Sequence, residues 1–164
     1  MFQALRPLAK EMLERAGVVV QFGSFIYCFG TYVMDVTTCV GPSMLPSFNA
    51  EGNIIFVEHI SPRLGRLKAG DVVTAQSPRN PNAVICKRIL GLEGDRIRVP
   101  PTMPRDSIRL VTVPKGHVWL QGDNQFVSRD SREYGPVPAA LVKGKVVFKI
   151  WPPSQFGHVE SRIP

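Results

Sequence analysis

A run of 19 residues without a charged side chain, Ala16 to Met34, most constrains how this chain can fold. About 20 apolar residues are enough for one helix to cross a lipid bilayer. A buried helix or a pair of core strands is the alternative, because Gln21, Ser24, Thr31 and three glycines dilute the run. On its length, we expect the run to form one N-terminal membrane-anchor helix.

The rest of the chain favours short strands over helices, because 15 prolines and 14 glycines are spread along its 164 residues. Segments rich in Val, Ile or Phe are bounded by turn-forming residues. They are Asn53–Val57, Asp71–Ala75, Ala83–Leu90, Arg96–Val99, Ile108–Val113, His117–Leu120 and Lys145–Trp151. This series predicts a mainly β fold, an antiparallel sheet or barrel. We expect an N-terminal segment and transmembrane anchor over 1–36, a β-rich domain over 37–152 and an irregular tail over 153–164.

The chain is basic, with 20 Lys and Arg against 13 Asp and Glu and a net charge of +7. These charges are scattered, and no basic block with interleaved aromatic residues is present. The distribution argues against nucleic acid as a partner and favours attraction to an anionic lipid surface. Basic charge therefore supports the expected contact with a lipid bilayer.

The three cysteines, Cys28, Cys39 and Cys86, are too few and too widely spaced for a disulfide framework or a zinc site. We interpret them as reduced thiols, while a Cys39–Cys86 bridge stays open as an alternative. The sequence accordingly predicts no metal and no cofactor.

The first segment that can carry chemistry is Gly41-Pro42-Ser43-Met44-Leu45-Pro46. Glycine and the two prolines favour a rigid, exposed loop around Ser43. A serine hydroxyl becomes a nucleophile only when a base is held beside it. Without such a base, Ser43 would be an ordinary turn residue.

A candidate base lies in the expected strand 83–90. Side chains alternate along a strand, so Ile85, Lys87 and Ile89 share one face. Burial among branched aliphatic residues lowers the pKa of a lysine and lets it act as a base near neutral pH. Arg88 could not replace Lys87, because a guanidinium does not deprotonate in proteins. A solvated Lys-Arg pair is the alternative.

A third segment begins with Gly122-Asp123-Asn124, which favours a tight turn. Ser128 could orient a lysine amine through a hydrogen bond. Asp130 and Arg132 could form a supporting ion pair. Taken alone, the segment would be a polar surface loop.

Together the three segments resemble the conserved boxes of the type I signal peptidases, the family of membrane proteases with a serine/lysine dyad. GPSMLP resembles the nucleophile box, KRILGLEGD the box of the general base, and GDNQFVSRDSREYGPVP the third box. The resemblance implies a signal-peptidase-type β domain. It also implies Ser43 as nucleophile and Lys87 as base, with support from Ser128, Asp130 and Arg132 and the Ser43 backbone N–H as oxyanion donor. Gly41 departs from the bacterial pattern, in which a hydroxyl residue supplies a second oxyanion donor.

Within the family, GHVWLQGDN and KVVFKIWPPSQFG resemble the mitochondrial inner membrane peptidases of the subunit 1 type. That resemblance implies an anchor in the mitochondrial inner membrane and a catalytic domain in the intermembrane space. It implies removal of sorting signals from precursor proteins, and a related second subunit as partner in a heterodimer.

Three other interpretations are open on the sequence. One is a Ser-His-Asp hydrolase built from Ser43, His117 and Asp123. Another is a self-cleaving repressor, but residues 1–35 are too short and too apolar for a DNA-binding domain. The third is a non-catalytic, membrane-tethered basic β module that binds anionic lipid.

Overall fold

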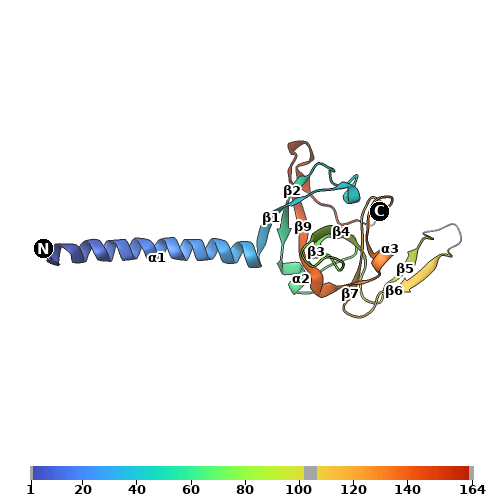
Figure 1. Cartoon of the computed structure of the whole chain (residues 1–164), viewed down its shortest axis with the longest axis horizontal. Coiled ribbons are helices and arrows are strands. Elements are labelled where there is room, and N and C mark those ends of the chain that lie inside the picture. The colour runs from blue at the N-terminus through green and yellow to red at the C-terminus, as the bar shows by residue number, and fades with distance from the viewer. Residues whose placement is uncertain (1, 102–106, 163–164) are drawn as a thin grey trace.

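The computed structural model describes residues 2–101 and 107–162. One long helix, α1 (Phe2–Tyr32), extends away from a β domain that contains the rest of the chain (Figure 1). Strand β1 (Met34–Cys39) begins directly after α1, so the helix continues into one edge of the main sheet.

The main sheet has the strand order β1-β2-β9-β3-β4-β7-β8, and its pairings are antiparallel. A short strand, β10, pairs with β9, and β5 and β6 form a separate ribbon. The strands after β1 are β2 (Asn53–Glu58), β3 (Val72–Gln76), β4 (Val84–Gly91), β5 (Arg96–Val99), β6 (Arg109–Thr112), β7 (His117–Gln121), β8 (Val137–Pro138), β9 (Val142–Trp151) and β10 (Gly157–His158). Two one-turn helices, α2 (Ile60–Arg63) and α3 (Ser131–Tyr134), lie in the connections.

The mainly β, antiparallel fold predicted from the sequence is confirmed, and each expected strand is present with small shifts at its ends. The structure differs at the two ends of the β domain. Residues 34–36, which were assigned to the N-terminal segment, belong to β1 and pair with β2. The tail after Trp151 is less irregular than expected, because Gly157 and His158 pair with β9.

The uncharged run expected to form a membrane anchor lies mostly inside α1. In residues 2–101 and 107–162, however, no helix combines the length and the apolar character needed to cross a membrane. The structure therefore does not bear out a bilayer-crossing span. The polar residues Gln21, Ser24 and Thr31 and three glycines lower the hydropathy of the run.

The domain core consists of apolar clusters to which neighbouring residues of one strand contribute separately. Val72 belongs to one cluster and Val73 to a second, as alternation along a strand requires. The first cluster also contains Met44 and Phe48, which are 1% and 0% exposed. Each such side chain stabilises the fold by about 1.5–3 kcal/mol on burial. The segment around Ser43 is thereby fixed to the core.

Candidate active site

The loop that carries Ser43 contains a 3₁₀ turn, η1 (Pro42–Met44). Gly41 enters it with a φ of +113°, a backbone conformation that strains any residue with a side chain. Its N–H donates to the carbonyl of Ala50 across the loop at 3.0 Å. This geometry favours glycine at position 41.

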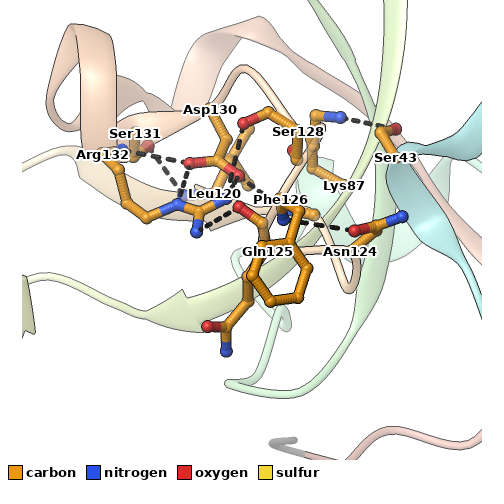
Figure 2. Close-up of polar contacts among 11 residues, drawn as sticks. Ser43, Lys87, Leu120, Asn124, Gln125, Phe126, Ser128, Asp130, Ser131 and Arg132 are labelled. Atoms are coloured by element: carbon orange, nitrogen blue, oxygen red, sulfur yellow. Dashed lines mark hydrogen bonds and ion pairs between the residues drawn. The ribbon is translucent and has the colours of Figure 1, made fainter. Parts of the chain in front are cut away.

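Lys87 comes from β4, where it pairs with Val73 of β3. Its side chain is 5% exposed, and its Nζ forms a hydrogen bond of 2.8 Å with Ser43 Oγ (Figure 2). Burial lowers the pKa of Lys87, and the charge of Asp130 opposes part of that effect. The structure thus brings together the two residues that the sequence predicted as nucleophile and base.

The turn after β7 packs against the other side of Ser43. The N–H of Asn124 donates to the Ser43 carbonyl at 3.1 Å. A Cβ added to Gly122 would overlap the Ser128 hydroxyl and lie 2.5 Å from the Ser43 carbonyl oxygen. Only glycine therefore allows the third segment to approach the nucleophile loop this closely.

Asp130 and Arg132 form an ion pair with 2.9 Å between Nε and Oδ1, and Asp130 is 0% exposed. Asp130 also accepts the N–H of Gly122 at 2.9 Å and caps α3 through the N–H of Arg132. Burial alone would raise the pKa of Asp130, but hydrogen bonds from Arg132 and Gly122 outweigh it and lower the pKa. This ionised carboxylate fixes the turn that holds Gly122.

Ser128 places its hydroxyl in a buried position next to Gly122. Among the residues that the structure describes, no hydrogen bond joins Ser128 to Lys87. An orienting role for Ser128 stays a prediction.

Sequence reasoning missed the role of Arg88 and Asp123. Arg88 Nε donates to Asp123 Oδ1 at 2.8 Å, and its Nη2 donates to Oδ2 at 2.7 Å. Its other bonds reach the Gly70 and Glu160 carbonyls and the Ser47 hydroxyl. One buried guanidinium therefore ties the nucleophile loop, the third segment and the tail together. Alternation along the strand could have indicated this role. It places Arg88 on the face opposite Lys87, and a cation that is buried on that face needs a carboxylate as its partner.

The alternative Ser-His-Asp triad is not assembled. The Nδ1 atom of His117 lies 2.9 Å from the Lys115 carbonyl, and Asp123 is engaged by Arg88. Likewise, the described part of the chain holds no cluster of three or more His, Cys, Asp or Glu side chains suited to a metal ion. The site consists of Ser43, Lys87 and the turn that supports them.

Comparison with known proteins gives the family to which the chain belongs. The family model for signal peptidase, peptidase S26, matches residues 11–103 and 102–151. The chain therefore belongs to the S26 signal peptidase family, and it is a peptidase of that family.

Its relatives narrow the comparison to one branch of the family. The chain is 46% identical to mitochondrial ATP-independent inner membrane protease subunit 1a of Arabidopsis thaliana, over 94% of this chain and 92% of the relative. It is 44% identical to mitochondrial inner membrane protease subunit 1 of Mus musculus, over 96% and 93%. Subunit 2 of the same protease from Schizosaccharomyces pombe is 40% identical over 79% of this chain and 71% of the relative.

Proposed function

We propose that this peptidase is a serine endopeptidase that removes sorting signals from mitochondrial precursor proteins, with Ser43 as nucleophile and Lys87 as general base. The observation that carries the proposal is the 2.8 Å contact between Ser43 Oγ and the buried Lys87 Nζ. Burial favours the neutral amine, and a neutral amine can accept the serine proton.

The reaction is an acyl transfer. Lys87 takes the proton from Ser43 while Oγ attacks the scissile carbonyl carbon, and the Ser43 N–H stabilises the resulting oxyanion. The carbon–nitrogen bond then breaks, and the Lys87 ammonium returns the proton to the leaving amine. In the second half, Lys87 deprotonates a water molecule that attacks the acyl ester and releases Ser43.

The substrate lies in a trough between two open strand edges. β1 pairs with β2 on one side only, and β4 pairs with β7 only from Arg88 onward. Residues 37–39 of β1, with Val40 after them, and residues 84–86 of β4 therefore lie on the two sides of a cavity of about 100 Å³, and no strand of the described residues pairs between them. An extended peptide can fill this gap as an added strand. The small volume favours small side chains next to the cut.

The trough also has a direction. A second, larger cavity of about 430 Å³ shares Thr37, Thr74 and Val84 with the first and reaches Gly30 and Thr31 near the end of α1. A precursor held beside α1 would therefore be led along β1 toward Ser43. Holding the scissile bond near the dyad in this way raises its effective concentration.

Asp130, Arg132 and Ser128 support the dyad in this proposal. The Asp130–Arg132 pair fixes the turn at Gly122, and that turn presses against Ser43. Ser128 would orient the Lys87 amine once substrate displaces solvent from the site. These residues position the reacting groups without exchanging protons with the substrate.

The names of the relatives support a cellular setting. The peptidase would act at the mitochondrial inner membrane, with the catalytic domain facing the intermembrane space and a related second subunit in a heterodimer. Protease added to intact mitochondria should spare the β domain, whereas protease added after rupture of the outer membrane should degrade it. Protection in both preparations would contradict the orientation.

The function is tested by cleavage of a purified sorting-signal precursor, with the presumed second subunit present and absent. Ser43→Ala and Lys87→Ala should abolish cleavage, and His117→Ala should cleave like the wild type. A dead His117→Ala variant with an active Lys87→Ala variant would favour the histidine triad. If all variants cleave alike, the activity lies elsewhere. Binding to anionic liposomes that Ser43→Ala leaves unchanged, with no cleavage, would then favour the lipid-binding module.

A further inference from the structure

Two cysteines face each other across the trough next to the dyad. Cys39 is the last residue of β1, and Cys86 directly precedes Lys87 in β4. Both line the cavity of about 100 Å³ between these strands. The third cysteine, Cys28, lies on the exposed surface of α1. The mechanism described above uses none of these thiols.

The two cysteine side chains pack on the same core cluster and line the same cavity. Cys39 is 7% exposed and belongs to the first core cluster, and Cys86 packs against that cluster while remaining partly accessible from the trough. Both are free thiols. Two thiols on the walls of one cavity of about 100 Å³ can reach the bonding distance of a disulfide when the two strand edges move together.

The pKa values of the two thiols are shifted in opposite directions. The hydrogen bond from Cys86 and the nearby charge of Lys87 lower the pKa of Cys39, although its burial acts in the opposite direction. The same hydrogen bond and burial raise the pKa of Cys86. Cys39 is thus the sulfur that ionises first, and the thiolate is the nucleophile in disulfide exchange.

We propose that Cys39 and Cys86 form a reversible thiol-modification site, at which a small-molecule disulfide such as oxidised glutathione links β1 to β4 and closes the substrate trough. The inference rests on the proposed function, because the trough is taken as the path of the precursor. The same two strand edges that would receive an extended peptide would then be joined covalently.

The chemistry balances in two exchange steps. The Cys39 thiolate attacks one sulfur of the small disulfide, forms a mixed disulfide and releases one small thiol. The Cys86 thiolate then attacks the Cys39 sulfur and releases the second small thiol. The two protein thiols lose two electrons and two protons, and the small disulfide takes up both. A small dithiol reverses the sequence.

The test compares cleavage by the full-length protein after incubation with dithiothreitol and with oxidised glutathione. Each sample is also analysed by intact mass. Wild type and the matched control Cys28→Ser should lose two hydrogens on oxidation, lose their cleavage activity and recover it after reduction. In the Cys28→Ser background, Cys39→Ser should gain no mass and keep its reduced rate after oxidised glutathione, whereas Cys86→Ser should stop at the mixed disulfide and gain the mass of one glutathione.

Three outcomes would overturn the inference. The disulfide could form by mass while wild-type cleavage stays unchanged, or no disulfide could form at all. The Cys28→Ser protein, which keeps both Cys39 and Cys86, could also stop at the mass of one added glutathione, which would indicate one reactive thiol rather than a pair. The proposed function fails separately, if the reduced wild type cleaves no better than reduced Ser43→Ala. In that case the proposed control of cleavage by the disulfide fails as well, and the mass measurement still reports whether Cys39 and Cys86 form a disulfide.

Discussion

Lys87 and Arg88 are neighbouring cations of β4 that are buried on opposite faces of the sheet. Their exposed fractions are 5% and 3%. Arg88 meets both oxygens of Asp123, a carboxylate that is itself 5% exposed. Among the described residues, no carboxylate lies within ion-pairing distance of Lys87, whose hydrogen-bond partner is the Ser43 hydroxyl. The two side chains are therefore about equally buried, but among the described residues Arg88 has a carboxylate partner and Lys87 has none.

In the proposed mechanism, this difference lets one strand hold both a base and a structural cation. A buried amine without an ion pair loses its proton more easily, so the pKa of Lys87 is lowered. A guanidinium keeps its charge in proteins, and burial is tolerated only with a matching carboxylate. In the proposed mechanism, the reactivity of Lys87 thus depends on the lack of a carboxylate within ion-pairing distance among the described residues. The rigidity around Arg88 depends on its pairing with Asp123.

The largest expected effect follows from removing the base. Lys87→Met should lower the rate of precursor cleavage by about 10⁴-fold or more, as loss of a member of a serine-protease triad does. The thermal midpoint should stay equal or rise, because a buried amine is replaced by an apolar side chain of similar length. Initial rates and thermal unfolding measure the two quantities. Lys115→Met, at an exposed loop, is the matched control, and a Lys87→Met enzyme with the control's rate would refute the dyad.

The mirror experiment removes the structural cation. Arg88→Met should reduce the free energy of unfolding by about 3–5 kcal/mol, because Asp123 is left buried without a partner. The double variant Arg88→Met/Asp123→Leu should recover much of this loss, since no buried charge is left unpaired. Denaturant titration measures both. If the Arg88→Met single variant were as stable as the wild type, the Arg88–Asp123 pair would not contribute to the stability of the fold.

A smaller effect tests the electrostatic cause at Lys87. The charge of Asp130 raises the pKa of Lys87, so Asp130→Asn should lower that pKa further. In the proposed mechanism, cleavage requires the neutral amine and its rate rises with pH through this pKa, so the rising limb of the rate profile should move to lower pH. Glu51→Gln, at an exposed position, should leave the limb in place. The profile is measured at a temperature at which both variants are folded, and an alkaline shift would contradict the assignment of Lys87 as base.

The smallest effect is expected at an exposed ion pair. Arg79 and Glu133 lie 3.0 Å apart with exposed fractions of 55% and 40%. Glu133→Gln should change the free energy of unfolding by less than about 1 kcal/mol, because solvent screens such pairs. The same denaturant titration checks it. A loss as large as that of Arg88→Met would show that burial is not what distinguishes the two pairs.

Much of the β domain could be predicted because its strands are local patterns. The alternation of Ile85, Lys87 and Ile89 is visible in the sequence, and β4 has the predicted extent to within one residue at each end. β1 was not among the predicted strands, because no glycine or proline separates Met34, the last residue of the uncharged run, from the rest of β1. α1 ends at Tyr32, where Arg63 donates to the carbonyls of Thr31 and Tyr32, and that contact joins residues far apart in the chain. The β10 pairing depends in the same way on β9 being in place.

The sequence by itself determined the strand pattern, the three polar segments and, through the family resemblance, the choice of Ser43 and Lys87. These features depend on residue types and on the spacing of residues that are close in the sequence. Only the tertiary structure decided that Lys87 is buried against Ser43, that Asp123 pairs with Arg88 rather than with His117, and that Cys39 and Cys86 line one cavity. The physical reason is that pKa values and ion pairs depend on burial and on neighbours from distant segments, which the folded sheet alone brings together.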